Sequence, residues 1–208
     1  MGVVAVRKRP GLYFNTDTKK YFSIVEYYDG EKYDTVAQAS GAISSGAILN
    51  LFRDLANKDK NDSNFDTARR ISKGEEMLVK RIGSECQSAF GNTLTVPADA
   101  RKVLWGAYLN VKINKIEVAE GPLVMFPSGY GVYGSTTENN TGVVSNGIPS
   151  TASQRPLEKI HEITSEHDIS GTVTFFDHSW DAANMPTLAG KVHIRVSLGG
   201  LIRRAATK

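Results

Sequence analysis

The sequence contains a single cysteine, Cys86, and this scarcity excludes an internal disulfide and a zinc site built from several cysteines. No apolar run reaches the length of about 18 residues that a membrane-spanning helix needs. The net charge is only +3, so the chain as a whole does not attract polyanions. A lone thiol suits a reducing compartment, and the opening residues MGVVAVRKRPG lack the charge order of a secretory signal.

The composition is that of an ordinary globular protein, with 40% hydrophobic and 23% charged residues. The length of 208 residues suits one domain with a sizeable core. Within it we expect strands and a hairpin at residues 1–37, a helical insertion at residues 38–90 and a β-sandwich core at residues 91–208. The predicted fold class is therefore α+β, mainly β, centred on an antiparallel β-sandwich.

The first region contains the pattern of a β-hairpin. The segments KYFSIVEYY and EKYDTVA are rich in aromatic and β-branched residues, and Asp29-Gly30 lies between them. An Asp-Gly pair suits a tight two-residue turn, because both positions of such a turn adopt positive φ. We therefore predict two strands joined by a turn at Asp29-Gly30.

The second region repeats apolar residues every four positions, which favours two amphipathic helices. In ASGAISSGAILNLFRDLANK the repeat consists of Ile43, Ala47, Leu51 and Leu55. In GEEMLVKRIGSECQSAF it consists of Leu78, Ile82, Cys86 and Phe90. The Cys86 thiol is then expected on the buried stripe of the second helix, as a packed core group rather than a nucleophile.

After residue 91, apolar residues alternate with polar ones, as they do in strands with one buried face. In KVLWGAYLNVKIN the apolar residues occupy the odd positions of residues 103–113. Ile116 and Val118 continue at even positions, so a bend or bulge near Asn114 and Lys115 must absorb the change of face. SGTVTFFDHSW and GKVHIRVSLGGLI predict two closing strands. The inward-facing residues of the second are Val192, Ile194, Val196 and Leu198.

The segment HEITSEHD, residues 161–168, gathers two histidines and several carboxylates, as a metal site would. The zinc motif H-E-x-x-H fails here, because Ser165 occupies the position of its second histidine. His161 and His167 are six residues apart, which places them on different sides of a helix, or about 20 Å apart along a strand. The segment therefore predicts a polar connection into the next strand, and we expect no metal and no cofactor.

Two further motifs give no site. GYGVYG at residues 129–134 matches the dinucleotide fingerprint G-x-G-x-x-G, but the loop sequence STTENNTG follows where the motif needs a helix N-terminus. His178 lies beside Asp177, Ser179 and Asp181, yet adjacent residues on a strand point to opposite faces and rarely form a triad. We therefore expect no catalytic residues.

The C-terminal segment carries a resemblance to a known family. A strand, a loop that contains AANMP and a final strand that ends in IRRAATK resemble the end of single-jelly-roll viral coat proteins. The resemblance implies a jelly-roll sandwich, a role in the virion and assembly from copies of the chain. Many such coats carry a long basic N-terminal arm, whereas this chain has only VRKRP.

The preferred hypothesis is a non-enzymatic, self-assembling structural protein, a capsid or coat subunit of a virus or phage. It would be made in the host cytoplasm and built into the virion as a homo-oligomer. Neighbouring copies would cover apolar loops such as LVMFPSGYGVY. Basic residues at both chain ends are the candidate contacts to nucleic acid. They are Arg7, Lys8, Arg9, Arg203, Arg204 and Lys208.

Two other classes of function remain open. The first is a single-stranded nucleic-acid-binding protein whose N-terminal hairpin stacks bases on aromatic side chains beside lysines. Its residues would be Tyr21, Phe22, Tyr27, Tyr28 and Tyr33, with Lys19, Lys20 and Lys32. The second is a hydrolytic enzyme that uses His161, His167 or His178.

Overall fold

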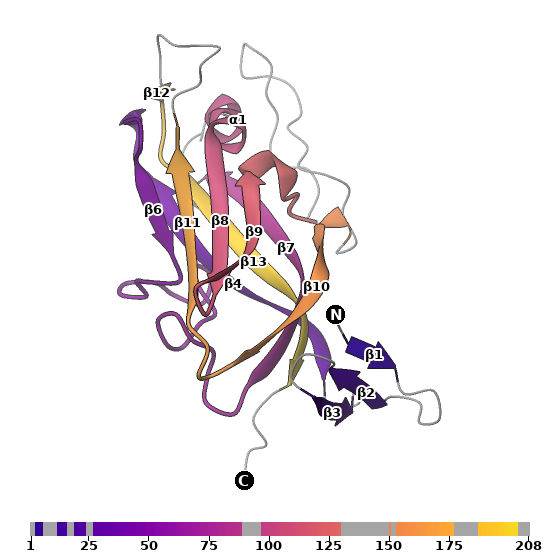
Figure 1. The fold of residues 1–208 in the computed structure, drawn as a ribbon. Coiled ribbons are helices and arrows are strands. Elements are labelled where there is room, and N and C mark those ends of the chain that lie inside the picture. The colour runs from indigo at the N-terminus through magenta and orange to yellow at the C-terminus, as the bar shows by residue number, and fades with distance from the viewer. Residues whose placement is uncertain are drawn as a thin grey trace.

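The computed structural model describes residues 3–5, 12–15, 19–23, 27–88, 97–129, 150, 153–176 and 187–203. Strands dominate these residues, so the prediction of a mainly β protein is confirmed. Figure 1 shows two layers of strands, with the short helix α1 (Pro97–Gly106) near one end. This two-layer arrangement is consistent with the predicted antiparallel sandwich.

Eight strands of the described residues form the two layers, and every neighbouring pair is antiparallel. One sheet has the order β10-β7-β13-β4 and the other the order β6-β11-β8-β9. The strands are β4 (Tyr28–Gln38), β6 (Ile48–Leu51), β7 (Glu76–Ser88), β8 (Ala107–Ile113), β9 (Ile116–Pro122), β10 (Arg155–Thr164), β11 (Ile169–Phe175) and β13 (Val192–Arg203).

The pairing of these eight strands is nested. Counted along the chain within these eight, the first strand, β4, pairs with the eighth, β13, and the second, β6, pairs with the seventh, β11. The third pairs with the sixth, as β7 with β10, and the fourth with the fifth, as β8 with β9. Two more pairings, β13 with β7 and β11 with β8, join these pairs into the two sheets. The topology is that of one long hairpin rolled up on itself.

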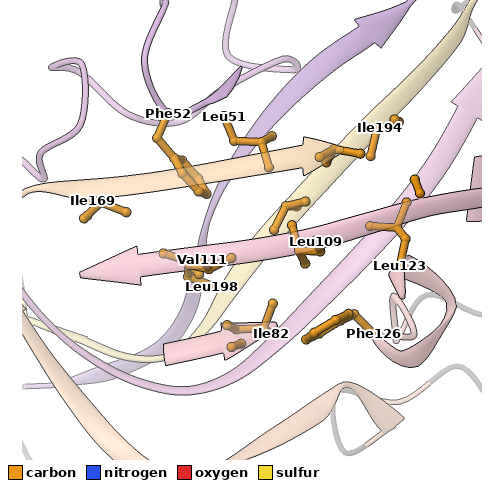
Figure 2. Close-up of a cluster of buried hydrophobic side chains, with 14 of the residues drawn as sticks. Leu51, Phe52, Ile82, Leu109, Val111, Leu123, Phe126, Ile169, Ile194 and Leu198 are labelled. Atoms are coloured by element: carbon orange, nitrogen blue, oxygen red, sulfur yellow. The ribbon is translucent and has the colours of Figure 1, made fainter. Parts of the chain in front are cut away.

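The core lies between the two sheets. Figure 2 shows Leu109 and Val111 of β8 near Ile82 of β7 and Leu198 of β13, and the side chains of these residues are fully buried. Burying one such side chain stabilises the fold by about 1.5–3 kcal/mol. The predicted inward-facing set of the last strand is confirmed, since all four residues are fully buried. They are Val192, Ile194, Val196 and Leu198.

The turn between β8 and β9 confirms the bend predicted at Asn114 and Lys115. Both residues have positive φ, 50° and 67°, as a two-residue hairpin turn requires. A register shift between Val111 and Lys112 shows a bulge in the same hairpin. The two-residue turn places Ile113 opposite Ile116, which accounts for the change from odd to even positions, and the bulge changes the parity back, so that Ala119 and Gly121 are the buried residues of β9.

The long strand predicted to include Val103 and Trp105 starts only at Ala107. The preceding residues form α1 instead, which begins at Pro97 and has Asp99 in its first turn. Proline and acidic residues are both favoured at helix N-termini, so the local sequence explains the helix.

The first helix predicted in the insertion at residues 38–90 is wrong. Its sequence forms β5 (Gly41–Ala42), a turn and β6. Gly41 and Gly46 have positive φ, 101° and 75°, and Phe52 also has a positive φ of 62°. Three left-handed residues within twelve positions cannot belong to one right-handed helix. β5 pairs with β12 (Thr187–Leu188) instead.

The second predicted helix is wrong as well, because its sequence forms β7, which pairs with β13 on one side and β10 on the other. A spacing of four is a multiple of the two-residue period of a strand, so Ile82 and Cys86 fit one face of a strand as well as a helix. The bulge in β7 then changes the inward-facing positions, so that Met77 and Val79 rather than Leu78 belong to the core cluster. The expectation that Cys86 is a buried core thiol is confirmed, since its exposed fraction is 4%.

The hairpin predicted at Asp29-Gly30 is wrong, because β4 runs straight through this pair. Gly30 lies opposite Gly200 of β13, and Asp29 lies opposite Leu201. A Cβ atom on Gly30 would lie 3.0 Å from Cδ1 of Ile202. The glycine therefore permits a close approach of neighbours within the sheet rather than a turn.

The N-terminal region forms a separate three-stranded sheet of the order β1-β2-β3 (Figure 1). Its strands are β1 (Val3–Ala5), β2 (Leu12–Asn15) and β3 (Lys20–Ser23). A short 3-10 helix, η2 (Leu123–Met125), follows β9. Across the described residues, no helix is long and apolar enough to cross a lipid bilayer.

Candidate functional site: a groove between two sheet edges

A groove of about 750 Å³ runs between β4 and β6, which are edge strands of different sheets. Its walls are residues 35–37 of β4 and residues 48–50 of β6. Six charged or ionisable side chains complete the lining: Arg53, Asp54, Lys58, Asp62, Lys191 and His193. Volumes of about 300–1,000 Å³ are typical of ligand sites, so this groove is large enough for one.

Asp34 joins the two edges at one end of the groove. Its side chain is fully buried, and its two oxygens accept hydrogen bonds from the Phe52 backbone N–H, at 2.6 Å, and from Lys58 Nζ, at 2.7 Å. These bonds connect β4 to the residue that follows β6. Because Phe52 has positive φ, Asp34 also holds the sharp change of direction that ends β6.

The outer edge of β4 is covered for half its length. The Tyr33 backbone N–H donates to Asn64 Oδ1, the Asn64 backbone N–H donates to the Tyr33 carbonyl, and Asn64 Nδ2 donates to the Glu31 carbonyl. Backbone groups on an edge strand alternate between facing the paired strand and facing outward. Since Tyr33 faces outward, Ala37 also directs its N–H and carbonyl outward, into the groove.

The edge of β6 follows the same alternation. The Ala47 carbonyl accepts a hydrogen bond from Phe175 of β11, so residue 47 faces the paired strand. Ile48 and Asn50 therefore direct their N–H and carbonyl groups away from β11 and toward the groove. The Phe52 N–H continues this outward series and reaches Asp34. Both walls thus present backbone donors and acceptors to the groove.

Two cationic or ionisable groups of the groove have no partner within the described part of the chain. Arg53 is exposed and forms no hydrogen bond or ion pair there. The Nε2 atom of His193 is buried and has no hydrogen-bond partner there. Burial lowers the pKa of His193, and the charge of Lys191 lowers it further, whereas Asp62 acts in the opposite direction. The imidazole is therefore mainly neutral at pH 7.

Of the basic residues predicted to contact nucleic acid, Arg203 is the one within the described residues. Its guanidinium forms an ion pair with Glu76, and its Cζ atom lies 5.9 Å from the ring centre of Tyr27. Its side chain is 35% exposed. The remaining five lie outside the described residues: Arg7, Lys8, Arg9, Arg204 and Lys208.

The aromatic and basic residues of the predicted hairpin do not share one surface. The Tyr33 ring stacks against Arg195 with 4.8 Å between guanidinium carbon and ring centre, and Tyr27 donates its hydroxyl hydrogen to Glu76 at 3.0 Å. Lys32 is buried and pairs with Glu75 at 2.8 Å. Tyr21 lies in the separate N-terminal sheet and is 65% exposed. Tyr27, Tyr33 and Lys32 of the predicted nucleic-acid platform are therefore engaged in contacts within the subunit.

The histidines of HEITSEHD occupy a strand and its closing turn. His161 pairs with Val79 within the sheet. His167 accepts a hydrogen bond at Nδ1 from the Thr164 backbone N–H, at 3.2 Å, inside its own turn. No metal-binding group of His, Cys, Asp or Glu occurs among the described residues. His178 and most of GYGVYG lie outside those residues.

Sequence reasoning missed the groove residues. Arg53, Asp54 and Lys58 belong to the segment predicted as a helix, where they would be ordinary solvated charges. The groove depends on which strands end up at the edges of the two sheets, and that is a property of the tertiary pairing. The one available signal was the alternation of the last strand, which places Lys191 and His193 on the face opposite to Val192 and Ile194.

Comparison of this chain with protein-family models and with curated protein sequences gives no match.

Proposed function

We propose that the protein is a non-enzymatic structural subunit of the capsid or coat type, which assembles with copies of itself, and that its two sheets form a jelly roll. The nested strand pairing carries this proposal. A jelly roll has eight strands in two sheets that are linked as Greek keys, and viral capsid domains use it widely. The sheet orders β10-β7-β13-β4 and β6-β11-β8-β9 support the assignment, because rolling up one long hairpin produces them.

A fold alone does not define a function, so the surface supplies the second support. Large apolar side chains are exposed at several separate places on the described residues. Those more than half exposed include Ile48, Trp105, Ile116 and Phe176. The Phe176 ring packs edge-on against the Tyr108 ring at the end of one sheet, with 5.8 Å between the ring centres. Exposed apolar groups at many points suit a subunit that several neighbours surround.

In such an assembly, the basic residues at the two ends of the chain are proposed to face packaged nucleic acid. In Figure 1, β1 to β3 and the C-terminal end of β13 lie at the same end of the sandwich, opposite to α1. This placement supports a shared basic surface, because the chain ends continue from these elements. The assembled particle, a virion formed in the host cytoplasm, is the proposed location.

Light scattering coupled to size-exclusion chromatography tests the proposal on the purified chain. We expect a large, uniform species that appears as shells, rings or tubes in negative-stain images. A raised ratio of absorbance at 260 nm to 280 nm within that peak would identify nucleic acid as its content. A compact monomer that persists at high protein concentration and at all salt concentrations contradicts the proposal.

A further inference from the structure

Within the described part of the chain, the outer face of the sheet β6-β11-β8-β9 is open, whereas much of the outer face of the other sheet is covered. On the covered face, Gln154 lies close over Gly83 and Gly199, and the outward-facing Ser197 is only 3% exposed. On the open face, the outward-facing residues of β8 and β11 are half-buried or exposed. In Figure 1 these strands lie in front of the other sheet, and no helix or strand is drawn over them.

The strand register arranges the outward side chains of the open face in three rows. The rows are Ile48, Thr174, Tyr108 and Pro122, then Asn50, Thr172, Asn110 and Glu120, and last Ser170, Lys112 and Glu117. A sheet face that meets water normally carries polar side chains. The first row departs from this, because Ile48 is 56% exposed and the exposed Phe176 packs its ring against Tyr108. Such an apolar row is typical of a contact with another protein surface.

The charged residues of the three rows all lie on one half of the face. Lys112, Glu117 and Glu120 belong to β8 and β9, whereas β6 and β11 contribute only apolar, hydroxyl and amide side chains. Beyond the rows, Arg53 and Asp54 follow β6, and their opposite charges offset each other. A face with one charged and one uncharged half can pack on a second copy of itself without opposing like charges, provided that unlike halves meet.

A two-fold axis along the strands, between β11 and β8, brings the unlike halves together. It places β6 of one copy over β9 of the other and keeps each row over the same row, so that the two apolar rows meet. Asn50 then lies over Glu120 of the other copy, where the amide can donate to the carboxylate. An axis across the strands, through the second row, would instead place the two copies of Glu120 over each other. The charge pattern therefore selects the axis along the strands.

We propose that the outer face of β6-β11-β8-β9 binds the same face of a second copy of the chain about this axis. The inference rests on the proposed self-assembly and names one of its contacts. Four strands about 4.8 Å apart and three rows about 6.8 Å apart give roughly 400 Å² per copy, which is about half of the roughly 800 Å² per partner in a standard interface. This contact alone is therefore weak, and it stabilises an assembly together with other contacts.

Light scattering at increasing protein concentration measures the concentration at which half of the chains are associated. Ile48→Asp places a charge in the apolar row, and Asn50→Glu places a carboxylate against Glu120 of the other copy. We expect each to raise this concentration at least tenfold, since every substitution occurs twice in a two-fold contact. Ala68→Glu adds the same charge at an exposed position between β6 and β7 and should have no effect. Circular dichroism checks that each variant keeps the fold.

The double variant Asn50→Glu with Glu120→Lys is the decisive test, because opposite charges then face each other across the contact. Within one subunit the two positions are three strands apart, about 14 Å, so they cannot form this pair inside the subunit. We expect the double variant to associate at a concentration within about threefold of the wild-type value. Loss of association in the single variant without recovery in the double variant overturns the two-fold arrangement.

The same measurements separate this inference from the proposed function. If the wild-type protein forms large assemblies that neither Ile48→Asp nor Asn50→Glu disturbs, the face is not a contact and the inference is wrong, while the assembly proposal stands. If the wild-type protein stops at a dimer that both variants dissociate, the inference holds and the capsid-type proposal fails. If it stays monomeric at all concentrations, both are wrong, because no second copy covers the face.

Discussion

Replacement of Asp34 by alanine tests how the structure holds the groove open. The Asp34 carboxylate is fully buried and contacts Lys58 Nζ at 2.7 Å and the Phe52 N–H at 2.6 Å. Breaking a buried ion pair by removing one partner costs about 3–5 kcal/mol. An orphaned buried N–H costs about 1–3 kcal/mol. Both losses follow from the same substitution.

The two costs do not add fully, because the Lys58 side chain is 17% exposed and lies beside the open groove, where water can solvate it. We therefore expect Asp34→Ala to lower the free energy of unfolding by about 4 kcal/mol. That is a large part of the roughly 5–15 kcal/mol of a typical domain. Urea denaturation followed by circular dichroism measures it, at a fixed protein concentration so that association does not shift the midpoint.

A matched control lies in the segment between β6 and β7, which also carries Lys58. Asp66 pairs with Lys60 at 2.6 Å, but both side chains are more than half exposed. Asp66→Ala should therefore cost much less, since exposed ion pairs contribute little in water. Adding Lys58→Met to Asp34→Ala should restore about half of the lost stability, because the uncompensated charge is removed. If Asp34→Ala and Asp66→Ala destabilise the protein equally, the reasoning about burial is wrong.

Three further changes test the sheets. Gly200→Ala should prevent folding, because its Cβ would lie 1.9 Å from the Leu78 carbonyl oxygen; a folded, soluble variant by circular dichroism would contradict the bulge geometry. Gln154→Ala should lower the melting temperature by about 7 °C, because a buried side chain that bonds Arg81 Nε at 2.8 Å is lost. An unchanged melting temperature would refute that role. Burial raises the pKa of Cys86 above its usual 9.0, so folding stability should fall as pH rises beyond 9; Cys86→Ala should flatten this decline, and an identical slope would refute it.

The sequence correctly predicted strands where the alternation of apolar and polar residues fits a strand and does not fit a helix. β13 alternates apolar and polar residues over its first half, and four of its predicted inward residues are fully buried. The turn at Asn114 and Lys115 was predictable because the apolar positions change parity there, which a strand can accommodate only by bending or bulging. In both cases a period of two was visible over enough residues to exclude a helix.

The sequence failed where a local pattern fits two structures. Ile82 and Cys86 are four residues apart, which suits both a helix and the core face of β7. Leu78 continues the repeat in the sequence, but beyond the bulge in β7 the residues of the core cluster are Met77 and Val79. Only the partners decide between them, and β7 has β13 on one side and β10 on the other. Asp29-Gly30 failed for a related reason. An Asp-Gly pair fits a turn, but a glycine also fits a crowded strand position, and Gly30 lies against Ile202.

The groove could not be predicted from the sequence for a different reason. Its walls come from two strands in different sheets, and they are brought together by the buried contact between Asp34 and Phe52 rather than by any local pattern. Native proteins usually cover or blunt the free edge of a strand, because an open edge invites pairing with other chains. Here Asn64 covers β4 at Tyr33, whereas no hydrogen bond from the described residues covers the edge at Ala37. Which strands lie at the edges is set by the pairing of the two whole sheets, so no local pattern within β4 or β6 could have indicated the groove.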